Sequence, residues 1–97
     1  DVRNTKVVDI VRALQAYRCQ VTIHDPMANP AEAEHEYGLS TTPSLPQGQN
    51  FDAVLIAVGH SEYAALGATG LRELGRKGAV LFDVKGLLPF GQAEGRL

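Results

Sequence analysis

The sequence predicts an α/β domain built on a parallel β-sheet, and two observations carry this prediction. Residues 51–60 and 79–83 are apolar runs of strand length without polar alternation at their centres, which is typical of strands buried on both faces of a parallel sheet. Helical patterns alternate with the strands, and this alternation favours right-handed crossovers between parallel strands. Because such sheets bind ligands at the carboxyl ends of their strands, the polar residues after each strand are the first candidates for a site.

The first part of the chain predicts a helix followed by a short strand. Residues 7–17 place apolar side chains at helical spacing, and Asn4 or Thr5 offers an oxygen that can cap the free backbone amides. Residues 20–24 alternate and are rich in β-branched side chains, so they predict a strand. Pro26 ends this strand because proline cannot donate to the hydrogen-bond ladder.

A second helix is predicted by its capping residues. Asn29 is a good N-cap, Pro30 suits the first helical position, and Glu32 completes a capping box. Gly38 predicts a left-handed end to this helix. Residues 39–50 are rich in proline, serine and threonine, so we expect an exposed loop.

The second half of the chain continues the alternation. After the run at 51–60, Ser61 predicts the cap of a short helix that the glycines of residues 67–70 interrupt. A glycine-bounded turn then leads into the strand at 79–83, and residues 86–97 predict no regular element. A doubly wound domain normally begins on a strand, whereas this pattern begins on a helix. We therefore expect residues 1–97 to form one Rossmann-like, three-layer sandwich that lacks its first strand and is a fragment of a longer protein.

Size, charge and composition limit the classes to which the chain can belong. Its 97 residues suit one domain, and 44% of them are hydrophobic. The net charge of −2 and the nine scattered Lys and Arg argue against nucleic acid as a partner. No run approaches the roughly 20 apolar residues of a membrane span, and we expect neither a membrane partner nor a secretion signal. A single cysteine, Cys19, suits a reducing cytoplasm.

The sequence lacks the motifs of an independent catalyst. G-x-G-x-x-G, G-x-x-x-x-G-K-[ST] and G-x-S-x-G are all absent. His24, His35 and His60 do not have the spacing of a helical zinc site and Cys19 adds no partner, so we expect no metal centre. His60 and Ser61 are adjacent in sequence, which does not orient one to activate the other. We expect no catalytic residue in this chain.

Polar side chains gather at the predicted carboxyl edge of the sheet. Arg3 precedes the first helix, Asp25 and His60 follow two strands, and Asp83 and Lys85 follow the third. Arg3 and Lys85 supply two cations that can bind a phosphate or carboxylate through charge-assisted hydrogen bonds. Structural roles remain open for the others, because Asp25 and Asp83 can each hold a turn and His60 can cap the loop that follows it. The pattern predicts an anion site without naming the anion.

Four stretches now carry a resemblance to a known family: Asp1–Thr5, His24–Pro26, Ala57–Tyr63 and Phe82–Gly86. In order and spacing they resemble the C-terminal domain of the UDP-glucose/GDP-mannose dehydrogenases. His35–Gly38 and Asp83–Gly86 look closest to the bacterial UDP-N-acetylhexosamine 6-dehydrogenases. The resemblance covers essentially the whole chain.

The resemblance implies a parent enzyme of three parts. An N-terminal Rossmann domain would bind NAD, a helical middle region would form a homodimer, and this domain would close over a UDP-sugar. Such enzymes oxidise the C6 alcohol of a nucleotide sugar to a carboxylate, with two NAD and a thiohemiacetal on a catalytic cysteine. That cysteine lies elsewhere in the parent and Cys19 does not match its motif. The resemblance thus implies an inactive fragment of a cytoplasmic enzyme of bacterial surface polysaccharide synthesis.

Residue by residue, the resemblance implies specific contacts. Lys85 matches the basic position that contacts the UDP-sugar, where many relatives have Arg, and Asp83 and His60 lie beside it in the pattern. Arg3 matches the arginine of an Asp-x-Arg loop that reaches toward NAD, with Asp1 bracing that loop. The family's Phe-Lys substrate contact belongs to a segment before this chain.

Two other classes of protein are compatible with the pattern. One is a non-catalytic interaction or assembly domain, which an exposed sheet edge would favour. The other is a flavodoxin-like signalling receiver, whose acidic cluster and lysine are only loosely imitated by Asp25, Asp83 and Lys85.

Overall fold

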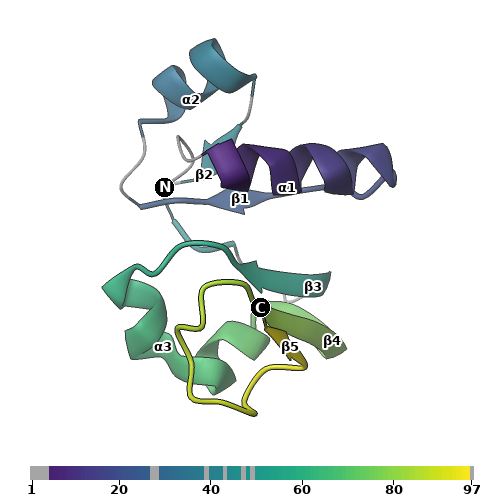
Figure 1. Cartoon of the computed structure of the whole chain (residues 1–97), viewed down its shortest axis with the longest axis vertical. Helices are drawn as coiled ribbons and strands as arrows, with labels where there is room; N and C mark the ends of the chain where they lie inside the picture. Colours follow the sequence, from purple (N-terminus) through teal and green to yellow (C-terminus); the bar gives the residue numbers. More distant parts are fainter. Residues whose placement is uncertain are drawn as a thin grey trace. The chain divides into compact units, whose positions relative to one another are not determined.

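The chain folds into α/β structure with parallel strands, compatible with a Rossmann-like fold, as predicted (Figure 1). The computed structural model describes residues 5–26, 29–38, 40–42, 44–46, 48 and 50–96. It divides the chain into two compact units, Asp1–Pro46 and Gln47–Leu97. Each unit carries its own small parallel sheet and is described by itself below.

The described residues of the first unit form four elements: α1 (Thr5–Ala16), β1 (Ile23–His24), α2 (Pro30–Tyr37) and β2 (Thr41–Thr42). The predicted first helix is confirmed, and α1 buries Val7 and Val11 on the apolar stripe that predicted it. Of its two candidate caps, Asn4 lies outside the described residues and Thr5 is the first helical residue. The helix ends in a left-handed turn at Arg18, whose φ is 66°.

The strand of the first unit is shorter than predicted. Of the strand expected at residues 20–24, only the two residues of β1 are in strand conformation. The loop expected at residues 39–50 contains β2, which pairs with β1 in parallel, with Ile23 opposite Thr41. The prediction of an irregular loop was wrong at this point, because two β-branched residues suffice for a short pairing when a partner strand is in register. The Thr42 hydroxyl adds a donation to the carbonyl of Ile23 at 3.3 Å.

The predicted caps Asn29 and Gly38 of the second helix are confirmed. The predicted capping box is not, because the Glu32 side chain makes no hydrogen bond to the Asn29 backbone among the described residues. The Asn29 side-chain oxygen accepts from the backbone N–H of Ala31 at 2.9 Å and of Glu32 at 3.3 Å, and Pro30 opens α2. Gly38 ends the helix at φ 65°, the left-handed conformation that glycine adopts without a Cβ clash.

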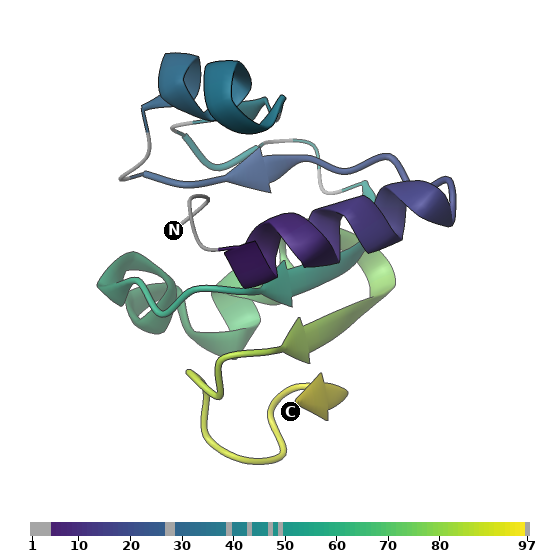
Figure 2. The same ribbon diagram turned by 45° about the horizontal axis from the view of Figure 1, so that its top comes forward.

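The second unit contains β3 (Phe51–Ile56), α3 (Ser61–Arg72), β4 (Gly75–Asp83) and β5 (Gly95–Arg96). The strands form one sheet in the order β3-β4-β5, with both pairs parallel, and Figure 2 shows the arrows of β3 and β4 pointing the same way. Helix α3 packs against β4. Among the described residues of this unit, five buried apolar side chains form the core: Ile56, Tyr63, Leu71, Leu81 and Leu88.

One expectation about β3 was wrong. The run at 51–60 is a strand only as far as Ile56, and it is not buried on both faces, because Ala53 and Leu55 are exposed. Successive strand residues point to opposite faces, and the described part of this unit offers only α3 to cover its sheet. The face of Ile56 is therefore the buried one.

Two further boundaries differ from the sequence expectations, and one expected interruption is confirmed. Ser61 is the first residue of α3 rather than its cap, because His60 occupies the N-cap position without a side-chain cap bond. The glycine interruption is confirmed as a kink at Gly67, where φ is 67° inside an otherwise continuous helix. Strand β4 begins at Gly75, ahead of the predicted 79, and a bulge opposite Phe51–Ala53 absorbs the additional residues.

The C-terminal stretch also contains an unpredicted strand. Gly95 and Arg96 form β5 beside Phe82 and Asp83 of β4. A Cβ at Gly95 would collide with the Phe82 ring, so glycine allows the close approach that this pairing needs. The neighbouring glycines and proline concealed this strand in the sequence.

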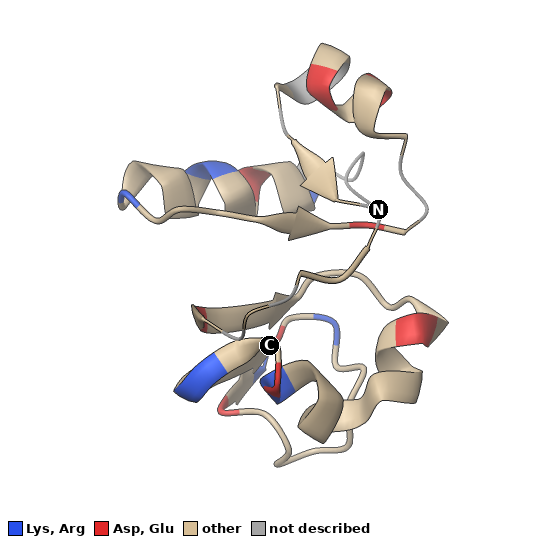
Figure 3. Ribbon diagram, turned by 180° about the vertical axis from the view of Figure 1, so that it is seen from behind, with Lys and Arg blue, Asp and Glu red and all other residues tan. Residues whose placement is uncertain are grey.

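Charged residues of both signs are distributed along the elements of each unit, as Figure 3 shows. None of the helices among the described residues combines the length and the apolar character that a bilayer crossing requires.

Candidate functional site

The candidate site lies at the carboxyl ends of β3 and β4. These strands pair in parallel with Ile56 opposite Asp83, so both end at the same edge of the sheet. The backbone N–H of Val84 donates to the carbonyl of Ile56 at 3.0 Å and joins the two strand ends. His60 follows the first strand end and Lys85 follows the second. We call residues 84–90 the rim loop.

Asp83 fixes the backbone of the rim loop through hydrogen bonds to its carboxylate. It is 1% exposed, and its two carboxylate oxygens accept from the backbone N–H of Leu87 at 3.0 Å and of Leu88 at 2.8 Å. Burial acts to raise the pKa of Asp83, but backbone N–H groups of Leu88, Leu87 and Gly86 and the positive charge of Arg96 outweigh burial, so the pKa lies below its ordinary value. The carboxylate stays ionised and organises this turn.

Lys85 stands at the start of the rim loop. It is exposed, and its ammonium group makes no hydrogen bond or ion pair with the other described residues. Gly86 follows it at φ 70°, which turns the chain sharply directly after the lysine. An ammonium on a sharp turn at the carboxyl edge can bind an anionic group through its three N–H donors.

His60 lies at the start of α3. Its backbone carbonyl accepts from the N–H of Tyr63 at 3.0 Å, and its half-buried imidazole meets the Tyr63 ring edge-on with centroids 5.6 Å apart. The aromatic contact orients the imidazole at the same sheet edge as the rim loop.

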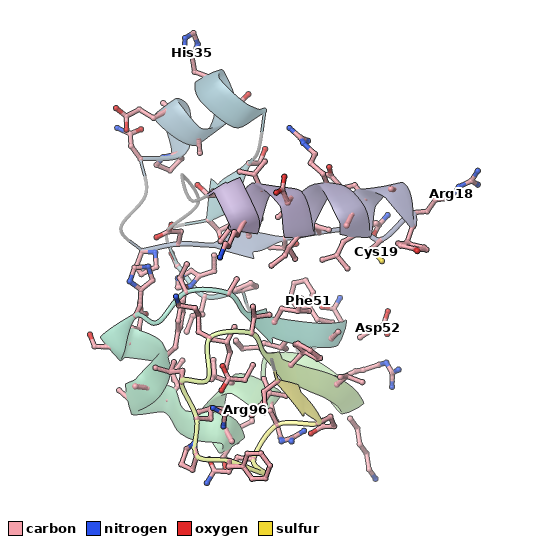
Figure 4. The ribbon with its side chains drawn as sticks, viewed as in Figure 1. Arg18, Cys19, His35, Phe51, Asp52 and Arg96 are labelled. Carbon is pink, nitrogen blue, oxygen red and sulfur yellow. The ribbon has the colours of Figure 1, made fainter. Side chains whose placement is uncertain are left out.

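Arg96 is a site residue that the sequence analysis missed. Strand β5 brings it beside Asp83, and its Nη1 donates to the carbonyl of Leu88 at 3.2 Å, with the guanidinium 5.7 Å from the centre of the Phe90 ring (Figure 4). The signal was weak, because an arginine behind a glycine-rich stretch indicates no strand. Its position becomes clear only through the pairing of β5 with β4.

Two other predicted site residues lie outside the described part of the second unit. Arg3 lies outside the described residues, so its predicted cofactor contact stays a prediction. Asp25 belongs to the first unit, where it is 3% exposed and its backbone N–H donates to the carbonyl of Thr42 at 3.3 Å. This burial and pairing suit the structural role left open for it.

The exposed ammonium of Lys85 gives this edge a group that can bind an anion. The described residues contain no group of three His, Cys, Asp or Glu side chains close enough to hold a metal ion. Cys19 is exposed and belongs to the first unit. The second unit thus offers a cation on a turn whose shape is fixed by a buried carboxylate and a second cation.

Comparison with known proteins assigns this chain to a class of nucleotide-binding domains. The family model of the UDP-glucose/GDP-mannose dehydrogenase family, UDP binding domain, matches residues 1–89. The chain therefore belongs to this family, as the sequence resemblance indicated.

Individual relatives agree with this assignment. The chain is 44% identical over all of its 97 residues to a UDP-N-acetyl-D-glucosamine 6-dehydrogenase of Pseudomonas aeruginosa and 36% identical to one of Salmonella typhi, in each case over 23% of the relative. It is also 33% identical over 88 residues, 91% of the chain, to Protein CapL of Staphylococcus aureus, over 20% of that protein. The chain thus spans less than a quarter of the length of these relatives. No solved structure matches it significantly.

Proposed function

We propose that residues 1–97 form the UDP-sugar-binding domain of an NAD-dependent nucleotide-sugar 6-dehydrogenase. The parent enzyme would oxidise the C6 alcohol of a UDP-N-acetylhexosamine, or of UDP-glucose, to the uronate for bacterial surface polysaccharide synthesis. The single observation that carries the proposal is the family match over residues 1–89, reinforced by two relatives named as UDP-N-acetyl-D-glucosamine 6-dehydrogenases.

In this proposal Lys85 contacts the diphosphate of the UDP-sugar. Its exposure and its place on a sharp turn support the role, because a compact ammonium can approach phosphate oxygens from several directions. Asp83 would act indirectly by fixing the loop, since both of its carboxylate oxygens accept hydrogen bonds from backbone amides. His60 would line the same edge, held by its contact with Tyr63.

NAD would be bound mainly by another part of the parent enzyme, where it would accept the hydride from C6. The sequence of this chain contains no glycine-rich phosphate-binding loop, so the phosphates of NAD would be held outside it. Arg3 is the one residue proposed here to reach NAD. The catalytic residues, the homodimer contacts and the cytoplasmic location likewise belong to the proposed parent.

Calorimetric titration of the chain with UDP and, separately, with NAD tests the proposal. We expect UDP to bind and NAD not to bind. Replacement Lys85→Ala removes a charge-assisted contact of about 1.5–3 kcal/mol, so it should weaken UDP binding by at least about tenfold. The matched control is Lys77→Ala, an exposed lysine at the other end of β4, which should leave the affinity unchanged. Absence of UDP binding, or equal affinities for Lys85→Ala and the wild type, would contradict the proposal.

The alternative is a non-catalytic interaction or assembly domain. Exposed apolar residues favour it, because Leu55 on β3 is 38% exposed and Val80 on β4 is 46% exposed. Strand β3 also ends the three-stranded sheet of its unit, and sheet edges invite pairing with another chain. Light scattering over a concentration series separates the two readings: a monomer that binds UDP rejects assembly as the function.

A further inference from the structure

The rim loop is fixed by two side chains from neighbouring strands. The peptide groups of Leu88 show this best: its N–H donates to Asp83 of β4 at 2.8 Å, and its carbonyl accepts from Arg96 of β5 at 3.2 Å. Leu88 itself is 5% exposed. The middle of the loop is thus held on both sides by ionised groups rather than by a strand ladder.

Arg96 also controls the turn directly after Lys85. A Cβ placed on Gly86 would lie 2.6 Å from Nη2 of Arg96 and 3.6 Å from its Cζ. The guanidinium therefore lies against the backbone of Gly86, in the space that any side chain at that position would need. The Arg96 guanidinium therefore packs directly against Gly86. Lys85 is the residue immediately before Gly86 in the sequence.

The geometry points to Arg96 as a positioning residue for Lys85: with Asp83 it holds the rim loop in the shape that presents the Lys85 ammonium to the diphosphate. The inference rests on the proposed function for its ligand, but its structural part concerns this chain alone. Arg96 has five N–H donors in a rigid fork, which suits simultaneous contact with a carbonyl, a backbone turn and an aromatic face. Lysine at position 96 would retain the charge and lose the fork.

The anchor of β5 makes a specific test feasible. Arg72 of α3 forms an ion pair with Glu94 and donates to the carbonyl of Gln92 at 2.8 Å, so the C-terminal segment is attached to α3 independently of Arg96. Removal of the Arg96 side chain should therefore loosen the rim loop while the core stays folded.

The first measurement uses no ligand. Amide hydrogen exchange at Leu88, followed by NMR, should accelerate at least tenfold in Arg96→Ala. The backbone of Leu88 loses one of its two side-chain hydrogen bonds in this variant. The matched control is Arg76→Ala, an exposed arginine whose Nε donates to Asp52 at 2.7 Å in the β4 bulge, and it should leave Leu88 exchange unchanged. Equal Leu88 exchange in Arg96→Ala and the wild type overturns the inference whatever UDP does.

The second measurement is a double-mutant cycle for UDP affinity. Arg96→Ala should weaken UDP binding about tenfold in the wild-type background and hardly at all in the Lys85→Ala background, because a residue that acts through Lys85 has nothing left to position. Arg96→Lys should recover part of the loss. Losses that add in the double variant would show that Arg96 binds the ligand itself and would overturn the positioning role. If the wild type binds no UDP, the proposed function fails, and so does the ligand part of this inference.

Discussion

At the scale of single residues, the left-handed position at the end of α1 stands out because arginine occupies it. Arg18 has φ 66°, its N–H donates to the carbonyl of Gln15 at 2.8 Å, and the N–H of Cys19 donates to that of Leu14 at 3.0 Å. This pair of bonds is the Schellman ending, which usually has glycine at the left-handed residue. An L side chain in this conformation costs about 1 kcal/mol.

Replacement Arg18→Gly should therefore stabilise the protein. We expect a rise of about 0.5–1 kcal/mol in the free energy of unfolding, since glycine removes the Cβ clash and the exposed arginine leaves no core contact behind. Urea unfolding followed by circular dichroism measures it. The control is Arg12→Gly, an exposed position inside the same helix, where glycine should cost about 1 kcal/mol. Destabilisation by both replacements would reject the explanation.

At the scale of elements, α2 depends on its caps because it is short. It spans eight residues, and helices of that length are marginal without end contacts. Asn29 satisfies two of the free N–H groups at its start, and Gly38 directs its own N–H to the carbonyls of Ala33 and Glu34 at its end.

Loss of the N-cap should accordingly be measurable. Asn29→Ala should lower the free energy of unfolding by about 1 kcal/mol, because the N–H groups of Ala31 and Glu32 lose their acceptor. Asn50→Ala serves as the control, since Asn50 is exposed and lies outside any helix, and it should change stability by less than about 0.5 kcal/mol. Equal effects at the two sites would contradict the capping role.

Strand β5 is held by a contact that depends on pH. The ion pair with Arg72, aided by the N–H of Leu81 at 3.1 Å, lowers the pKa of Glu94 from 4.5 to about 2. A carboxyl group whose pKa is lowered by folding stabilises the native state above its unfolded pKa. That stabilisation is fully present above about pH 4.5 and disappears as the pH falls toward 2.

A pH series of urea midpoints tests this linkage. The wild type should lose stability steadily between pH 4.5 and 2, and Glu94→Gln should show a flatter profile, because its side chain no longer takes up a proton on unfolding. Some slope should remain in the variant from Asp83, whose pKa is also lowered. Parallel profiles for the two proteins would show that the ion pair makes no net contribution in solution.

At the scale of the whole molecule, strong local signals predicted the elements and weak ones did not. The apolar periodicity of α1 and the caps of α2 depend on neighbouring residues, so the sequence revealed them directly. Strands β2 and β5 have two residues each, and they exist only because a partner lies beside them. A pairing between distant segments leaves no periodic pattern in either one.

The same distinction explains the candidate site. Asp83 ends a recognisable strand and Lys85 follows it, so their place at a sheet edge was predictable. Arg96 reaches that edge through β5, and its role followed from neither spacing nor composition. The exposed face of β3 escaped prediction for a related reason, because an apolar run does not reveal how many layers cover it.

The connection between β4 and β5 has a consequence for proteolysis. Residues 84–94 connect β4 to β5 without a helix. The rim loop lies at the start of this connection and β5 at its end, so the pairing of β5 with β4 closes the segment into a loop. If a carboxypeptidase digests residues 1–97 as an isolated chain, removal of Arg96 would release that segment from β4 and leave Lys85 in place but unsupported. An anion bound at Lys85 should in turn slow this trimming, since it stabilises the closed form that resists the protease. The rate at which the isolated chain loses Arg96 would thus report whether an anion occupies Lys85, at the other end of the segment.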